Sequence, residues 1–220
     1  MKIAGFTFIR NAIKNDYSIV EAITSILPIC DEFVVAVGKS EDDTLGLIKS
    51  IPSNKIRIIE TVWDDTKRVG GQTFALETDK AYQAISPDVD WAFYIQGDEC
   101  VHEDDLPVIK QSMEQYAADE AVEGLLFHYR HFYGSYAYVA VSRRWYRREI
   151  RVIKRHPQVH SYKDAQGFRK DGNKMKVKLI PAYINHYGWV KPPEGLNNKV
   201  RNFTQFYHDD AWLAENVPAD

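Results

Sequence analysis

Two adjacent carboxylates, Asp98 and Glu99, follow a strongly apolar run, and no other segment of the sequence points as directly to chemistry. The run 91–95 has the composition of a buried strand, and Gln96 and Gly97 separate it from the two acids. Like charges at one strand end repel each other unless a cation lies between them. Mg²⁺ and Mn²⁺ prefer carboxylate oxygens and also bind phosphates. We therefore predict that Asp98 is a metal ligand; a solvated turn or a helix cap is the alternative.

The segments that must position this loop alternate between strand-like and helix-like patterns. Strands are expected at 3–9, 33–37, 56–62 and 91–95, and helices at 19–27, 45–51, 74–85 and after Asp105. The 45–51 helix is expected to start at a cap formed by residues 42–44. This alternation predicts an α/β fold with a mostly parallel sheet covered by helices.

Ligands of such sheets bind at the carboxyl ends of the strands, which selects four loops. They are 10–11, 38–43, 63–65 and 96–99. Asp64 and Asp65 in the third loop are candidate ligand contacts, and a helix-capping role is equally compatible with the sequence. Basic side chains suit phosphate oxygens, so Lys39, Arg68, Arg143 and Arg144 are candidate phosphate partners.

The texture of the sequence changes after about residue 123. Residues 124–155 are predicted to form two long strands around a Gly134-Ser135 turn, and Asp171-Gly172-Asn173 is predicted to join a strand to another at 176–180. A polar, aromatic helix is expected at about 196–208. Aromatic residues make up 13% of the chain and are concentrated here, so they either pack the core or form a platform for a sugar.

Composition narrows the classes of partner. The chain has 220 residues with 28 basic and 31 acidic side chains, and its net charge of -3 argues against binding nucleic acid. An RNA surface at 143–155 is the alternative, and it predicts strongly salt-dependent binding that we expect to be absent. No apolar run is long enough to span a membrane, and no signal segment is recognised, so a cytoplasmic protein without an integral membrane segment is expected. A homo-oligomeric partner could cover the apolar side chains of the last segment, namely Phe203, Phe206, Tyr207 and Trp212.

Three segments of the first half resemble, in order and spacing, the motifs of glycosyltransferase family 2. They are the opening strand and polar loop at 6–11, the strand, loop and helix start at 31–44, and Gln96-Gly97-Asp98-Glu99, which is similar to the family's Asp-x-Asp metal motif. The resemblance covers about residues 3 to 120 well and the remainder loosely. It implies a GT-A, Rossmann-like three-layer fold, with a donor-binding portion at 1–120 and a strand-rich acceptor portion at 121–220 in one continuous domain.

The resemblance also implies an activity and roles for particular residues. The activity is metal-assisted, inverting transfer of a sugar from a nucleotide-sugar donor to a carbohydrate or glycolipid-type acceptor, with Mn²⁺ or Mg²⁺ as cofactor. The metal ligands would be Asp98, Glu99 and His186, and the base that activates the acceptor would be Asp164. The residues expected around the donor are Arg10, Asn11, Lys39, Asp64, Asp65, Gln96, Gly97 and Arg144.

The sequence departs from the family's pattern at two positions. Gln96 stands where the family has the first acid of the metal motif, and Val37-Gly38 stand where many members have a base-binding Asp. Gln96 carries no charge, which would weaken metal binding. The alternative prediction is therefore a catalytically weak or inactive GT-A-fold protein that binds nucleotides or carbohydrates. His186 near aromatic residues is also compatible with a purely structural role.

Overall fold

An eight-stranded sheet forms the centre of the chain in a computed structural model that describes residues 1–67, 69–192, 195–196, 204, 206–207 and 212. The strands lie in the order β3-β2-β1-β4-β7-β6-β11-β5. Their bounds are β1 Ile3–Ile9, β2 Glu32–Gly38, β3 Ile56–Thr61, β4 Trp91–Tyr94, β5 Glu99–Cys100, β6 Gly124–Tyr133, β7 Arg148–Lys154 and β11 Val177–Trp189. The four strands predicted for the first half are confirmed, with ends shifted by a residue or so.

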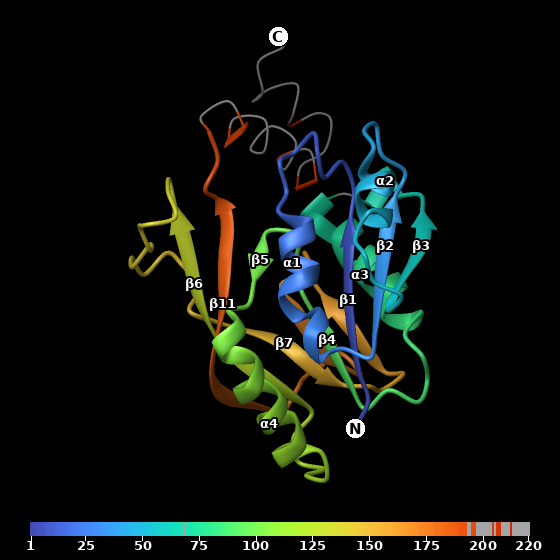
Figure 1. Cartoon of the computed structure of the whole chain (residues 1–220), viewed down its shortest axis with the longest axis vertical. Helices are drawn as coiled ribbons and strands as arrows, with labels where there is room; N and C mark the ends of the chain where they lie inside the picture. Colours follow the sequence, from blue (N-terminus) through green and yellow to red (C-terminus); the bar gives the residue numbers. More distant parts are fainter. Residues whose placement is uncertain (68, 193–194, 197–203, 205, 208–211, 213–220) are drawn as a thin grey trace.

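Most strands of this sheet run in one direction. Strands β3, β2, β1 and β4 pair in parallel, as do β6 and β11. Because β7 lies antiparallel between β4 and β6, β6 again points the same way as β4, while β5 runs against β11. The carboxyl ends of the parallel strands therefore share one edge of the sheet, in the upper part of Figure 1.

Helices cover both faces of the sheet, which confirms the three-layer α/β prediction. Their bounds are α1 Ile19–Ile26, α2 Thr44–Lys49, α3 Gln72–Gln83 and α4 Leu106–Tyr116, with short 3-10 turns η1 Leu27–Ile29, η2 Asp65–Lys67, η3 Val69–Gly71 and η4 Glu103–Asp105. Helices α1, α2 and α4 pack into one core and α3 into the other. Alternating residues of β2 enter the two cores, since Val35 faces the first and Val34 the second.

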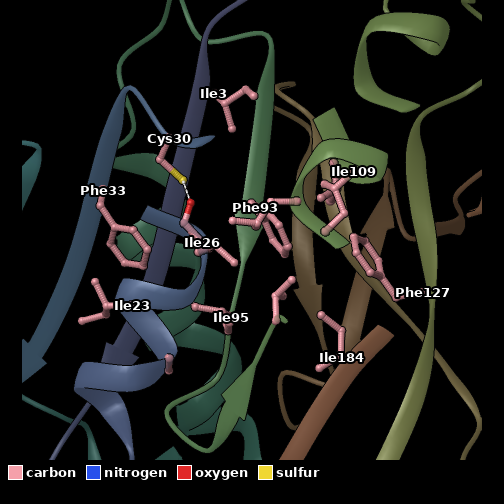
Figure 2. Close-up of a cluster of buried hydrophobic side chains, with 14 of the residues drawn as sticks. Ile3, Ile23, Ile26, Cys30, Phe33, Phe93, Ile95, Ile109, Phe127 and Ile184 are labelled. Atoms are coloured by element: carbon pink, nitrogen blue, oxygen red, sulfur yellow. Dashed lines mark hydrogen bonds between the residues drawn. The ribbon is translucent and has the colours of Figure 1, made fainter. Parts of the chain in front are cut away.

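The first core shows why these residues form these elements. In Figure 2, Ile23 and Ile26 of α1 lie near Phe33 of β2, and Ile95 continues the buried run of β4. The thiol of Cys30 is buried and donates to the Ile26 carbonyl at 3.2 Å, so it is a packed free thiol. The cap predicted before α2 is also present, because Asp43 accepts a hydrogen bond from the Gly46 amide at 3.1 Å.

Two predictions for the second half were wrong. No long strand follows the Gly134-Ser135 turn directly, because residues 135–144 are largely exposed and pair only through an isolated Phe132–Val139 bridge. The second strand is β7, which begins at Arg148. The strand expected at 176–180 belongs to β11 and joins the central sheet beside β6, so it does not pair across the Asp171-Asn173 turn.

A separate three-stranded sheet holds that turn. It consists of β8 Val159–Tyr162, β9 Gly167–Lys170 and β10 Asn173–Lys174, all antiparallel. Phe168 of β9 is buried in the core formed by α3, so this small sheet packs against the same layer. The helix expected at 196–208 lies mostly outside the described residues. No helix of the described chain is long and apolar enough to cross a membrane.

Candidate functional site

The register of three strands brings the predicted metal ligands together. Strand β5 pairs Glu99 with His186 of β11, and β11 in turn pairs His186 with His131 of β6. Asp98 directly precedes β5, and its carbonyl accepts a hydrogen bond from the Tyr187 amide at 2.8 Å. As a result, Asp98 Oδ2 lies 3.5 Å from His186 Nε2, although the two residues are far apart in the sequence.

A chain of contacts fixes which nitrogen of His186 carries a proton. The Tyr146 carbonyl can only accept a hydrogen bond, so His131 Nε2, 3.1 Å away, must donate to it. Burial and the neighbouring His186 imidazole lower the pKa of His131 to about 4, so His131 is neutral at pH 7 and its Nδ1 is an acceptor. His186 Nδ1, at 3.2 Å, must then donate to His131 Nδ1. His186 Nε2 is therefore the ring nitrogen that faces the Asp98 carboxylate, where the two side chains can share a proton or bind a metal ion.

Glu99 is placed very differently from Asp98. Its carboxylate is fully buried and accepts hydrogen bonds from Arg151 Nη2 at 2.6 Å, Arg151 Nε at 2.9 Å, the Gln96 amide at 3.0 Å and the Tyr129 hydroxyl. Although burial alone would lower the pKa of Arg151, Glu99 holds it well above its usual value. These bonds occupy both carboxylate oxygens, so Glu99 is engaged in a structural ion pair beneath the Asp98 loop.

A β-bulge aims Arg151 at Glu99. The pairing of β6 with β7 passes from Leu125–Val152 to Leu126–Ile150 and leaves Arg151 without a partner in the register. The freed side chain turns inward, where its Nη1 also donates to the Gln166 carbonyl at 3.2 Å. Arg151 therefore connects Glu99, at the end of the β4–β5 loop, to the loop that contains Asp164.

The predicted base, Asp164, lies at the centre of a strained loop. Lys163 and Ala165 on either side have φ values of 55° and 64°, a region that residues with a side chain adopt at some cost. The Gln96 side chain donates to the Ala165 carbonyl at 3.2 Å and helps to hold this geometry. Gln96, which replaces an acid in the family's motif, thus connects the Asp98 loop to the Asp164 loop.

The Asp164 carboxylate is half satisfied. Tyr207 donates to its Oδ2 at 2.7 Å, while its Oδ1 is buried and has no hydrogen-bond partner among the described residues. Gly71 packs directly against this residue, because a Cβ there would lie 2.5 Å from Asp164 Cβ, and its φ of 72° favours glycine. A buried carboxylate oxygen without a donor is costly, which makes it a candidate for contact with a ligand hydroxyl.

A second carboxylate, that of Glu149, also lies near Arg151. Its Oε2 is 3.9 Å from Arg151 Nη1, and its side chain is only 15% exposed. Burial raises the pKa of Glu149 to about 7, and the neighbouring charges of Glu99 and Asp164 act in the same direction. A carboxylate that titrates near neutrality beside a candidate base is typical of catalytic sites and also occurs in structural networks.

The predicted donor residues of the first two loops lie at the same sheet edge. Asn11 links these loops, because its side chain accepts from the Glu41 amide at 2.8 Å and its own amide donates to Ser40 at 3.0 Å. The Arg10 guanidinium lies 5.3 Å from the centre of the Trp63 ring. Lys39 is exposed and follows the end of β2. Trp63 also packs tightly over Gly38, where a Cβ would lie 2.4 Å from the indole nitrogen.

Other predicted donor residues are less connected to this centre. Asp64 accepts from the Thr66 amide at 3.0 Å and hydroxyl at 2.6 Å, which lowers its pKa and gives it the capping role considered for it. Asp65 begins η2, Gly97 is buried against Ile9, and Arg144 is exposed on the β6–β7 connection. Arg143 is exposed beside it, and Arg68 lies outside the described residues.

The residues at the β4–β5 loop fit a divalent cation only in combination with a ligand. Among the residues that the structure describes, no cluster of three or more His, Cys, Asp or Glu side chains could hold a metal by itself. Asp98 and His186 supply one carboxylate and one imidazole 3.5 Å apart. A cation shared with a diphosphate needs few protein ligands, and an imidazole suits Mn²⁺ better than Mg²⁺.

Sequence reasoning missed His131, Arg151, Tyr129 and Glu149. The contacts of His131 and Arg151 depend on strand pairing and on a bulge, for which the sequence carries no local signal. The separation of Asp98 from Glu99 had a signal, because neighbouring residues at the start of a strand point to opposite faces.

The fold is similar to that of solved nucleotide-handling enzymes at low sequence identity. TarS 1-349 from S. aureus, a GT-A glycosyltransferase, is 11% identical over 94% of this chain, with a TM-score of 0.52. Its complex with UDP is 13% identical with a TM-score of 0.51. The 4-diphosphocytidyl-2C-methyl-D-erythritol synthase of Anaerococcus prevotii is 12% identical over 90% of this chain and 95% of its own, with a TM-score of 0.50.

These similarities concern the fold. The chain spans 65% of the length of TarS 1-349. No family profile and no curated protein matches the sequence. The shared architecture, with helices on both faces of a mostly parallel sheet, is the one that the family resemblance implied. The chain therefore has a GT-A glycosyltransferase fold.

Proposed function

We propose that the chain is a glycosyltransferase that moves a sugar from a nucleoside-diphosphate sugar to an acceptor hydroxyl, by inverting, direct displacement. The observation that carries the proposal is the Asp98–His186 pair, in which Asp98 Oδ2 and His186 Nε2 lie 3.5 Å apart at the carboxyl ends of the strands. The GT-A fold supports the donor class, since a similar protein was solved with UDP. The remaining assignments follow from the residues around this pair.

Asp98 and His186 would hold a divalent cation, preferably Mn²⁺, together with the donor diphosphate. When bound, the cation neutralises the charge that develops on the leaving diphosphate. His131 holds the His186 ring so that Nε2 is directed toward Asp98. We assign Glu99 to holding Arg151, because five hydrogen bonds already occupy its carboxylate.

The nucleotide would lie over the first three loops. Trp63 and Arg10 offer an aromatic face and a guanidinium there, and Asn11 holds two of the loops together. We propose that Lys39 and Arg144 reach the phosphates and that Asp64 and Asp65 contact the ribose or base. Gln96 and Gly97 form the floor beside Asp98, and Gln96 links this floor to the Asp164 loop.

Asp164 would act as the base. Its unpartnered Oδ1 takes the proton of the acceptor hydroxyl, and Tyr207 holds Oδ2 in place. The acceptor oxygen then forms a bond to the anomeric carbon as the bond from that carbon to the diphosphate breaks. The proton remains on Asp164 and the electron pair leaves with the nucleoside diphosphate.

The test is a screen of nucleotide-sugars with and without Mn²⁺, which follows thermal stabilisation and the release of free nucleoside diphosphate. We expect one donor to stabilise the protein in a Mn²⁺-dependent manner and to be hydrolysed slowly in the absence of an acceptor. Hydrolysis should be lost in Asp98→Asn. Binding without turnover would instead support the inactive, binding-only alternative. Stabilisation by no donor would contradict both readings.

A further inference from the structure

The connection between β6 and β7 forms a cavity that the proposed chemistry does not use. Its volume is about 410 Å³, and its walls are Tyr133, Tyr138, Val139, Ala140 and Trp145. This is the region in which the sequence predicted a simple hairpin. It lies at the same edge of the sheet as the ends of β6 and β11 (Figure 1).

Backbone bonds shape the cavity. Tyr133 donates to the Tyr138 carbonyl at 3.0 Å, and Ala140 donates to the His131 carbonyl at 2.8 Å. Gly134, with a φ of 72°, makes the turn between them. The walls are therefore held by the end of a sheet strand.

The cavity presents aromatic faces at several angles. Trp145 lies 6.1 Å from Tyr133 at an interplanar angle of 63° and 5.8 Å from Trp189 at 78°. Tyr133 is 50% exposed and Tyr138 72% exposed, which is unusual for large side chains with apolar faces. Exposed aromatic faces of this kind can pack on the C–H faces of a sugar ring.

The surroundings of the cavity are strongly basic. Besides Arg144, which we assign to the donor phosphates, Arg143 precedes Trp145, and Arg147 and Arg148 follow Tyr146; these three are exposed. None of the three forms an ion pair with any residue that the structure describes, although the chain as a whole has a net charge of -3. This local excess of positive charge complements a carboxylate or a phosphate.

The cavity is also connected to the site. The Trp145 ring packs on the His131 ring with centroids 4.7 Å apart, and His131 contacts His186 through their Nδ1 atoms at 3.2 Å. A molecule that fills the cavity would therefore lie one aromatic ring and one imidazole away from the proposed cation site.

We propose that this cavity binds an acidic saccharide, as an acceptor subsite beside the transfer centre. The inference rests on the proposed transferase function and specifies the class of its acceptor. The aromatic lining and the link to His186 favour a saccharide over single-stranded RNA or a membrane surface. The acidic group would be a uronate carboxylate or a sugar phosphate.

The test is calorimetric titration of the full chain with tetragalacturonic acid, with a phosphate-bearing pentamannose 6-phosphate, and with neutral maltotetraose. We expect saturable binding of at least one acidic probe, at least tenfold weaker binding of maltotetraose, and loss of the preference in the double variant Arg147→Gln/Arg148→Gln. The two acidic probes distinguish a carboxylate from a phosphate.

A matched pair of variants locates the site. Tyr138 and Tyr136 are both highly exposed on this connection, but only Tyr138 lines the cavity, whereas Tyr136 packs on Tyr187 at 5.6 Å. We expect Tyr138→Ala to weaken acidic saccharide binding at least tenfold and Tyr136→Ala to leave it within twofold. Equal effects of the two variants would overturn the proposal.

Three further results would also overturn it: no binding of either acidic probe, equal binding of maltotetraose, or binding of single-stranded RNA or anionic vesicles with the same Tyr138 dependence. Binding of UDP with Mn²⁺ is measured on the same sample. Wild type that binds UDP with Mn²⁺ but no saccharide refutes the acceptor inference alone, whereas wild type that binds neither refutes the transferase proposal as well.

Discussion

Asp98 and Glu99 are adjacent carboxylates at the end of the β4–β5 loop, but they lie in very different environments. Asp98 lies 3.5 Å from the imidazole of His186 and its side chain is 13% exposed, whereas the Glu99 side chain is fully buried and paired with Arg151 and Tyr129. We propose that the first carboxylate binds a ligand, while the second supports the loop. Two neighbouring acidic residues can therefore have different roles: Asp98 is the proposed metal ligand, and Glu99 is the structural support beneath it.

Neutralising each carboxylate separately tests whether Asp98 and Glu99 have different roles. Asp98→Asn should lower donor turnover by about 10³-fold, because the proposed cation contributes several kcal/mol to stabilising the leaving group. Its free energy of unfolding should change by less than about 1 kcal/mol. Glu99→Gln should instead clearly lower the free energy of unfolding, measured in urea. Asp98→Asn turnover equal to that of wild type would contradict the assignment.

The buried side of the comparison is tested at Arg151. Arg151→Met leaves Glu99 charged and buried without its cation, which should cost about 3–5 kcal/mol in the free energy of unfolding. Arg148→Met is the matched control, because Arg148 is an exposed arginine on the same strand. The double variant Glu99→Leu/Arg151→Met should recover much of the loss. A cost no larger than that of Arg148→Met would show that the pair is not a structural support.

The role of His131 in positioning His186 can be tested by substitution. His131→Phe removes the acceptor for His186 Nδ1, so the His186 tautomer is no longer fixed, and Mn²⁺ affinity in the presence of UDP should fall about 10- to 100-fold. His131→Asn retains a side-chain acceptor and should restore part of the affinity. His128→Phe serves as the control, because His128 lies on the same strand but stacks on Tyr183 instead. Affinity unchanged in His131→Phe would refute the positioning role.

The smallest expected effect concerns Glu149, on the Arg151 side. Its folded-state pKa of about 7 lies above the ordinary value of 4.5, so the protonated form is favoured by folding. This contribution is fully present below about pH 4.5 and is lost as pH rises through about 7. Glu149→Gln should therefore raise the unfolding free energy by about 2 kcal/mol at pH 8 and by little at pH 4.5.

Urea unfolding at the two pH values checks this sign. Glu41→Gln is the control, because Glu41 is exposed, pairs with Lys14 and has a lowered pKa, so that variant should give no gain at pH 8. A Glu149→Gln variant that loses stability at pH 8 would mean that the Glu149 carboxylate is charged and favourably paired in the folded chain.

Local patterns in the sequence were sufficient for the first half of the fold. Apolar runs marked β1 to β4, and Asp43 marked the start of α2. The second half was harder to predict, because β7 and β11 find their partners far along the chain and their pairing depends on a bulge and on register. The loop between β6 and β7 is exposed and lines a cavity. Its alternation of apolar and polar residues resembles that of a strand, so the sequence pattern did not distinguish the two.

The candidate site follows the same division. Asp98, Glu99 and His186 were predicted to be metal ligands, from the strand end and from the family resemblance. The structure places Asp98 and His186 3.5 Å apart and buries Glu99 against Arg151. The roles of His131 and Arg151 could not be predicted, because they arise from contacts across β6, β7 and β11. Glu99 shows that residue type alone is insufficient, since burial decides whether a carboxylate binds a ligand or an arginine.

The central claim is that Asp98 and His186 hold a cation together with a nucleoside diphosphate. The most direct measurement is titration of Mn²⁺ by electron paramagnetic resonance with UDP present, in which binding to protein removes signal beyond the loss caused by UDP alone. We predict tight, UDP-dependent binding by wild type and by Glu99→Gln, and binding at least tenfold weaker in Asp98→Asn and His186→Ala. Wild type and Asp98→Asn that bind Mn²⁺ equally, or wild type that removes no signal beyond UDP, would contradict the claim.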